Sequence, residues 1–269
     1  MPRKNGFAQV NETNLYYEIQ GRGETIIFIH AGPMNTSMWD DQFDYFAKNY
    51  QVVRYDVRGY GKSSLPADKP YSHQDDLKAL LDYLNKSQAH VLGLSMGGGI
   101  AIDFTLAYPE HVTSLIACDT ALGGFQWSET QMKRSKWLYE NLVPAYQEQK
   151  LQAAIDVYLQ DPLVQPALDK GLQYVLVQQL GAYQGWHLIN PDPLQQLDPP
   201  AINRLQEIHI PTLLIVGDRD LDDFQEIIKT IHGSVQNARK EVIANSGHVT
   251  NMEQPEIFNE VVMGFLESL

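Results

Sequence analysis

The segment Gly93-Leu-Ser-Met-Gly97 places a serine between two glycines, where an apolar run ends and a helical pattern begins. The run His90–Gly93 is typical of a buried strand, and the helical periodicity extends from Met96 to Tyr108. A Gly-x-Ser-x-Gly pattern in this context predicts a very tight strand-to-helix turn that exposes the serine hydroxyl. The flanking glycines let neighbouring backbone pass closely. Ser95 is therefore the predicted nucleophile for chemistry at a carbonyl carbon.

A serine hydroxyl is a weak nucleophile at its own pKa and needs an adjacent base. We predict His248 as this base, because Ser246-Gly-His248 lies between a predicted strand, Lys240–Ile243, and the last predicted helix, Pro255–Leu269. A loop in that position lies at the carboxyl edge of a parallel sheet, as Ser95 does. The remaining histidines are interpreted as surface or structural residues, with His30 alone expected near the site: His30, His73, His90, His111, His187, His209 and His232.

A base of this kind needs a carboxylate that fixes the imidazole tautomer and stabilises the imidazolium. The predicted strand Thr212–Val216 ends in an acidic loop, which lies at the same edge of the sheet. Asp119, which follows the predicted strand Leu115–Ala117, is a more remote candidate. The candidates in the loop are Asp218, Asp220, Asp222 and Asp223.

Attack on a carbonyl also needs hydrogen-bond donors for the oxygen that becomes negatively charged. Backbone amides suffice, and one is expected at Met96, directly after the nucleophile. The second should come from the loop His30-Ala-Gly-Pro33, which follows the predicted strand Ile26–Ile29; the candidates are Gly32 and Ala31. Met34, next in the chain, and His30 are expected to border the substrate.

These residues need a sheet to bring them together, and the chain has the pattern of one. Short apolar runs alternate with amphipathic stretches, which predicts a doubly wound, mostly parallel α/β sheet of eight strands. The first two runs have no helix between them and predict an antiparallel hairpin at one edge. The predicted strands are Ala8–Val10, Leu15–Ile19, Ile26–Ile29, Val52–Tyr55, His90–Gly93, Leu115–Ala117, Thr212–Val216 and Lys240–Ile243, and the predicted core helices are Ser72–Leu84, Met96–Tyr108, Phe224–Ile231 and Pro255–Leu269.

The alternation stops between about Gly123 and Leu205, where the pattern predicts several helices and no strand. We interpret this stretch, 123–205, as a helical cap inserted into a core of residues 1–122 and 206–269. Its aromatic residues supply candidate pocket walls, and Trp127 and Trp186 are the predicted substrate contacts. The predicted cap helices are Ser128–Val143, Gln149–Leu159 and Ala167–Tyr183.

Composition narrows the possible partners of this 269-residue chain. A net charge of −13 without a cluster of Lys and Arg disfavours nucleic acid and anionic membranes as partners. No stretch approaches the roughly 20 apolar residues of a membrane span. A single cysteine, Cys118, excludes an intramolecular disulfide and fits a reducing compartment. We expect a cytoplasmic monomer or homodimer that acts on a small molecule, with neither metal nor cofactor.

Together, the serine turn, the acidic loop, the histidine loop and the insertion resemble the α/β-hydrolase superfamily over essentially the whole chain. The resemblance is greatest to its small capped esterases, enol-lactonases and carbon–carbon bond hydrolases. It implies Asp220 as the acid, because Gly217–Asp220 has the family's Gly-x-x-Asp spacing and the family's chain order is Ser, Asp, His. It implies Gly32 as the second donor, because His30–Pro33 is similar to the family's His-Gly-x-Pro, with Ala31 where glycine is usual.

The resemblance implies a serine hydrolase that cleaves a small carboxylic ester or a lactone through an acyl-enzyme. Serine at position 95 disfavours the haloalkane dehalogenases and epoxide hydrolases of the same fold, which need a carboxylate nucleophile. The alternatives are a carbon–carbon bond hydrolase, a cofactor-free oxygenase, perhydrolase or lyase, and a ligand receptor without turnover.

Overall fold

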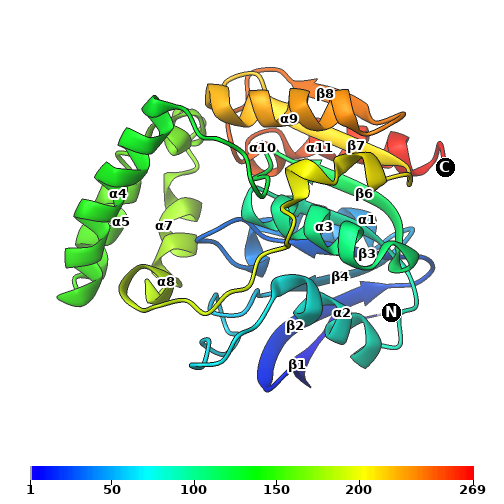
Figure 1. Cartoon of the computed structure of the whole chain (residues 1–269), viewed down its shortest axis with the longest axis horizontal. Coiled ribbons are helices and arrows are strands. Elements are labelled where there is room, and N and C mark those ends of the chain that lie inside the picture. The colour runs from blue at the N-terminus through cyan, green and yellow to red at the C-terminus, as the bar shows by residue number, and fades with distance from the viewer. Residues whose placement is uncertain (1) are drawn as a thin grey trace.

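The computed structural model describes residues 2–269, which form one eight-stranded, mostly parallel sheet with helices on both faces (Figure 1). The strand order is β1-β2-β4-β3-β5-β6-β7-β8. This architecture confirms the predicted doubly wound fold class. The strands are β1 (Lys4–Val10), β2 (Thr13–Gly21), β3 (Thr25–Ile29), β4 (Gln51–Tyr55), β5 (Ala89–Leu94), β6 (Val112–Cys118), β7 (Thr212–Gly217) and β8 (Arg239–Ile243).

The predicted hairpin forms one edge of the sheet. Strands β1 and β2 pair antiparallel, β2 pairs antiparallel with β4, and the pairs from β4 to β8 are parallel. Every residue of β3, β4, β5 and β7 is buried. Parallel strands that are covered on both faces have continuous apolar sequences, and for this reason these strands could be predicted from the sequence.

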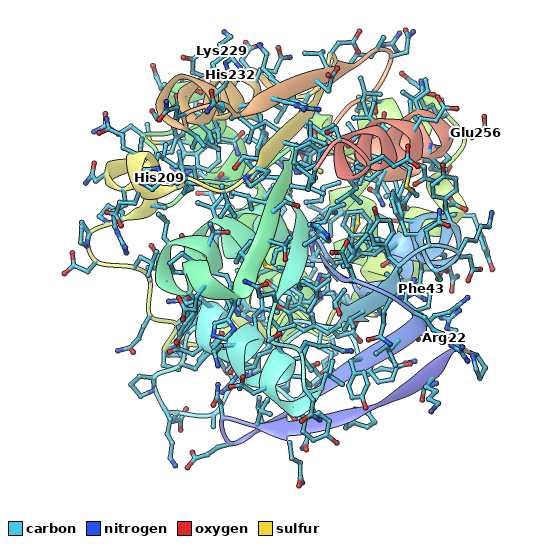
Figure 2. The ribbon with its side chains drawn as sticks, turned by 90° about the vertical axis from the view of Figure 1, so that its right-hand side faces the viewer. Arg22, Phe43, His209, Lys229, His232 and Glu256 are labelled. Carbon is cyan, nitrogen blue, oxygen red and sulfur yellow. The ribbon has the colours of Figure 1, made fainter. Side chains whose placement is uncertain are left out.

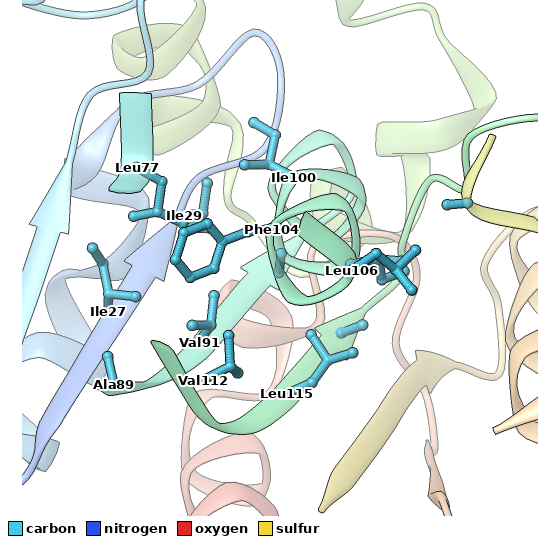
Figure 3. Packing of buried hydrophobic residues seen from close by; sticks show 14 of the residues in the cluster. Ile27, Ile29, Leu77, Ala89, Val91, Ile100, Phe104, Leu106, Val112 and Leu115 are labelled. Carbon is cyan, nitrogen blue, oxygen red and sulfur yellow. The ribbon is translucent and has the colours of Figure 1, made fainter. Parts of the chain in front are cut away.

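Two separate apolar cores fill the two faces of the sheet. Alternate residues of β3 point to opposite faces, so Ile27 and Ile29 belong to one core and Phe28 to the other. Figure 3 shows Phe104 of the helix after β5 directed toward Ile29 and Val91 in the first core. On the other face, the ring of Phe28 packs 5.2 Å from that of Trp39.

The helices around the sheet agree with the predicted order, and α1 and several short helices add to it. Helices α2 (His73–Tyr83), α3 (Met96–Ala107) and α9 (Asp222–Ser234) contribute to the first core, and α1 (Asp40–Phe46) and α11 (Pro255–Leu266) to the second. The short α1 was not predicted, because its seven residues span two turns and hold too few apolar positions to show a period. Short helices complete the core: α10 (Thr250–Glu253), η1 (Thr36–Trp39), η2 (Pro109–His111), η4 (Ala201–Asn203) and η5 (Leu205–Glu207).

Between the neighbouring strands β6 and β7 the chain forms helices and no strand, and we refer to α4–α8 as the helical insert. Figure 1 shows α4, α5, α7 and α8 standing apart from the sheet, on the left of the view. The predicted helix Ala167–Tyr183 is two helices, because Gly171 adopts a positive φ of 77°. The insert comprises α4 (Glu129–Gln147), α5 (Leu151–Tyr158), η3 (Pro162–Val164), α6 (Gln165–Asp169), α7 (Gln173–Gly181) and α8 (Trp186–Ile189).

Within residues 2–269, no helix has the length and apolar character needed to cross a membrane.

Candidate active site

Ser95 lies in the turn between β5 and α3, in a strained backbone conformation with φ 56° and ψ −115°. Its amide donates a hydrogen bond of 2.9 Å to the carbonyl of Cys118, at the end of the neighbouring strand β6. A Cβ atom at Gly93 would overlap the carbonyl oxygen of Gly97, and one at Gly97 would overlap that of Ile29. Glycine is therefore required on both sides of the serine, and the turn holds the hydroxyl at the carboxyl edge of the sheet.

His248 and Asp220 come together from the loops after β8 and β7. The Nδ1 atom of His248 lies 3.0 Å from Oδ2 and 3.1 Å from Oδ1 of Asp220, and both side chains are buried. The ring of Phe224, in α9, covers the imidazole at a centroid distance of 4.2 Å. Nε2 has no hydrogen-bond partner among residues 2–269. A carboxylate at Nδ1 favours the tautomer with the proton on that atom, which leaves Nε2 unprotonated and able to accept a proton.

The other acids of the same loop have different partners. Asp218 accepts a hydrogen bond from the amide of Ser246, and Asp223 accepts two from Ser128 at the start of the helical insert. Asp222 is exposed at the first position of α9. Asp220 is thus the acid of this loop whose carboxylate reaches the imidazole, and its catalytic role remains a prediction.

Asp119 is buried at the end of β6 and connects the two loops. Its Oδ1 accepts a 2.9 Å hydrogen bond from the amide of Gly217, and its Oδ2 accepts one of 2.6 Å from the hydroxyl of Thr250. Burial, and next the charge of Asp220, raise the pKa of the Asp119 carboxyl well above its usual range. The contacts make Asp119 a structural link behind the acid and histidine loops.

Glu253, which was not singled out in the sequence, holds the histidine loop from the inside. Its carboxylate accepts hydrogen bonds of 2.7 Å from the amide of Gly247 and 3.2 Å from that of Val249. These two amides lie on either side of His248. Burial raises the pKa of the Glu253 carboxyl. Its position five residues after the histidine, on a short helix, offered no recognisable pattern.

The loop after β3 passes beside the serine turn. A Cβ atom at Gly32 would lie 3.4 Å from the sulfur of Met96, so the two residues predicted as oxyanion donors are neighbours. His30 ties this loop to the next one: Nδ1 lies 2.9 Å from the carbonyl of Ala31, and Nε2 accepts from the amide of Val57 at 2.9 Å. Burial lowers the pKa of His30, and its two contacts fit the neutral ring.

A cavity of about 540 Å³ opens on Ser95 and Met96 between the core and the segments that lead into and out of the helical insert. Its size is typical of a small-molecule site. The predicted contact Trp127 lines it, whereas Trp186 does not; the neighbouring residue His187 does. His30 and Met34 are also absent from its walls, because the former bonds within its loop and the latter packs in the second core.

Comparisons with known proteins agree with this geometry. Residues 24–255 match the family model described as the alpha/beta hydrolase fold. The chain is 30% identical over 245 residues to 3-oxoadipate enol-lactonase 2 of Acinetobacter baylyi, covering 88% of this chain and 86% of that one. The chain belongs to the α/β-hydrolase fold family. The protein is therefore a member of a hydrolase family.

Other proteins also match this α/β hydrolase over most of both chains. The 2-hydroxy-6-oxononadienedioate/2-hydroxy-6-oxononatrienedioate hydrolase of Paraburkholderia xenovorans is 30% identical over 277 residues, which cover 95% of this chain and 91% of that one. A crystal structure of a hydrolase from Pseudomonas aeruginosa superposes with a TM-score of 0.76 at 24% identity, covering 98% of both chains. The latter similarity shows the shared fold.

Two histidines of this α/β hydrolase that were interpreted as surface or structural residues line the cavity instead. Burial lowers the pKa of His73 to about 3, and burial also lowers that of His187. Both rings are therefore neutral near pH 7 and offer hydrogen bonds rather than charge. By contrast, His209 and His232 are exposed, as expected, on the outer surface (Figure 2).

Proposed function

We propose that this α/β hydrolase is a serine hydrolase that cleaves a small carboxylic ester or a lactone through an acyl-enzyme. One observation carries the proposal: the buried hydrogen bond between Asp220 and Nδ1 of His248, with Nε2 left without a partner, at the sheet edge that holds Ser95. A buried carboxylate–imidazole pair at the same sheet edge as a strained serine is the arrangement from which a hydroxyl can be activated.

The reaction has two halves. In the first, Oγ of Ser95 bonds to the carbonyl carbon while Nε2 of His248 accepts its proton. The carbon–oxygen bond to the leaving group then breaks, and the imidazolium returns the proton to the departing oxygen. In the second half, water gives a proton to His248 and its oxygen bonds to the acyl carbon. Ser95 leaves with the proton, and the carboxylic acid is released.

The amides of Met96 and Gly32 are the proposed donors to the carbonyl oxygen. Met96 is the first residue of α3, where amides are free of intrahelical partners. The sulfur of Met96 lies beside Gly32, so the two residues flank one space next to the serine. In comparable sites each such donor contributes about 3–4 kcal/mol to the transition state.

The size of the cavity and the name of one relative both support an ester or a lactone as substrate. The cavity combines apolar walls with a few polar groups, and it takes a substrate of moderate size in a site that the proposed cap, the helical insert, would cover. The enol-lactonase relative is named for a lactone. A carbon–carbon bond hydrolase, which one relative's name describes, needs the same nucleophile and base and is the second candidate.

A covalent probe tests the nucleophile directly. Wild-type protein incubated with a fluorophosphonate should gain one adduct, and peptide mass spectrometry should locate it on Ser95. The wild type should hydrolyse members of a panel of p-nitrophenyl esters and lactones, and Ser95→Ala should lose at least about 10³-fold in kcat/KM. Labelling that is absent in folded protein, or turnover that persists in Ser95→Ala, would contradict the acyl-enzyme. Release of a ketone cleavage product, with the esters untouched, would favour the second candidate.

A further inference from the structure

Asp103 is an acid in the substrate cavity that the proposed reaction does not use. It lies on α3, the helix that begins next to Ser95, and it lines the cavity together with Met96, Gly99 and Ile100. These four positions follow the spacing i, i+3, i+4 and i+7, which defines one face of a helix. The eight residues from Ser95 to Asp103 separate the two Cα atoms by about 12 Å along the helix axis.

The carboxyl group of Asp103 has no partner within the protein. No hydrogen bond or ion pair joins it to any residue in the range 2–269, and the residue is half-buried in the cavity wall. The nearest cation, Arg204, binds Glu207 and the carbonyl of Leu106 instead. The second acid in the cavity, Asp192, accepts a hydrogen bond of 3.0 Å from Tyr71. A carboxylate that is partly withdrawn from water and has no partner in the protein has its hydrogen-bonding and charge-pairing capacity free for a ligand in the cavity.

The rest of the cavity wall favours a positive ligand. Among the described residues that line the cavity, none is a lysine or an arginine. The aromatic rings of Phe125 and Trp127 line it as well, 5.4 Å apart, and aromatic faces attract cations. His73 and His187 add no positive charge, because burial lowers the pKa of both rings.

We propose that Asp103 binds a cationic group, a protonated or quaternary amine, at the end of the substrate remote from the carbonyl that Ser95 attacks. The position of the carbonyl rests on the proposed function, whereas the binding of the cation does not. The substrate class is therefore an ester or lactone with an amine remote from the reacting carbonyl, on the scale of the ~12 Å that separates the Cα atoms of Ser95 and Asp103 along α3.

Calorimetry with a probe that cannot be hydrolysed tests the cation site independently of turnover. Decyltrimethylammonium should bind the wild type at pH 8, and Asp103→Asn should weaken binding about 10- to 100-fold, as expected for a hydrogen-bonded or charge-paired group. Decyl sulfonate, with the opposite charge, should bind the wild type more weakly than the ammonium probe. The matched control Asp68→Asn removes the same charge from an exposed position and should leave binding within about twofold.

The pH dependence identifies the carboxyl group. Burial raises the pKa of Asp103 to about 6, and Arg204 lowers it in part. The carboxyl is therefore charged at pH 8 and protonated at pH 5, so the wild type should lose its affinity for decyltrimethylammonium as the pH falls through about 6. A quaternary amine does not titrate, and Asp103→Asn should show a smaller change. Asp192 also lines the cavity, so Asp192→Asn distinguishes its contribution.

Kinetics then connect the cation site to catalysis. We compare p-nitrophenyl esters whose acyl chains end in trimethylammonium with esters in which carbon replaces the nitrogen, over a series of chain lengths. The wild type should prefer the cationic esters at one length, and Asp103→Asn should lose about 10- to 100-fold of that preference. Equal use of both esters, or equal binding of decyltrimethylammonium by wild type and Asp103→Asn, would overturn the proposal. Absence of any turnover that depends on Ser95 would instead contradict the proposed function and leave calorimetry to decide on Asp103.

Discussion

At the scale of single residues, Asp218 and Asp220 lie in one loop and differ in what their carboxylates reach. Asp220 contacts Nδ1 of His248 from a fully buried position, whereas Asp218 accepts from the amide of Ser246. A carboxylate at Nδ1 fixes the tautomer, and an amide in its place favours the wrong one. The two acids therefore have different predicted roles because the loop directs only the carboxylate of Asp220 toward the imidazole.

Asp220→Asn should lower kcat toward an ester about 10³- to 10⁴-fold with little change in thermal stability. Asp218→Asn, the matched control from the same loop, should keep activity within about threefold. Steady-state kinetics and a melting curve for each variant check both statements. A larger loss in Asp218→Asn, or in Asp119→Asn, would transfer the acid's role to that residue and leave Ser95 and His248 in place.

At the scale of elements, the backbone of the loop between β8 and α10 is held by the carboxylate of Glu253, at the end of α10. Glu253 accepts from the amides of Gly247 and Val249 and so fixes the backbone on both sides of His248. Hydrogen bonds to a charged group stabilise by about 1.5–3 kcal/mol, and leaving buried amides unpaired costs a similar amount. The histidine is thus positioned by Glu253 of the following helix, α10, as well as by Asp220.

Glu253→Gln should lower kcat about tenfold while KM changes little, because the amide can accept from one backbone N–H and must place its own donor near the other. The exposed Glu256→Gln, on α11, loses the same charge and should retain full activity (Figure 2). Hydrogen exchange of residues 244–250 should increase in Glu253→Gln. A variant whose exchange and kcat match the wild type would show that the loop holds without this carboxylate.

At the scale of the whole molecule, the helical insert is joined to the core by a stack of rings. Tyr60, from the loop after β4, stacks on Tyr183 at 5.2 Å and on His187 at 4.4 Å, and it lines the cavity as well. Asp223, in the first turn of α9, adds a second junction through Ser128. Val164, Ala167 and Leu176 of the insert also pack into the second core, so several contacts between segments far apart in the chain hold the insert against the core.

Tyr60→Ala should destabilise the attachment of the helical insert by about 3 kcal/mol, the low end of the cost of removing a packed aromatic ring, because Tyr60 is only partly buried. Amides of α7 and α8 should then exchange faster, while those of β5 and β6 keep their protection. Tyr60→Phe retains the ring and should show wild-type exchange. Uniform acceleration over the whole sheet in Tyr60→Ala would mean that the ring supports the core rather than the junction.

Much of the fold follows from local sequence patterns. Strand and helix alternation, the edge hairpin and the place of the insertion depend on periodicity within short windows, and each is recognisable without contacts. The same is true of Ser95, because the elbow needs glycine on both sides at fixed spacing. His248 was predicted from its position after a strand. Helix α1 and the break at Gly171 were missed, because a two-turn helix and a single glycine carry little periodic signal.

The tertiary structure decided which polar groups contact His248 and which line the cavity. Asp220 differs from Asp218 only in the path of one loop, and His187 faces the cavity where its neighbour Trp186 does not. Asp103 and His73 have ordinary helical surroundings in the sequence, and their position in the wall of the cavity that Ser95 also lines depends on how α2, α3 and the insert pack. Sequence patterns report which side of an element is apolar, because burial repeats with the helix or strand period. The polar residues of a site come from several elements, so their convergence is defined only when those elements are placed in three dimensions.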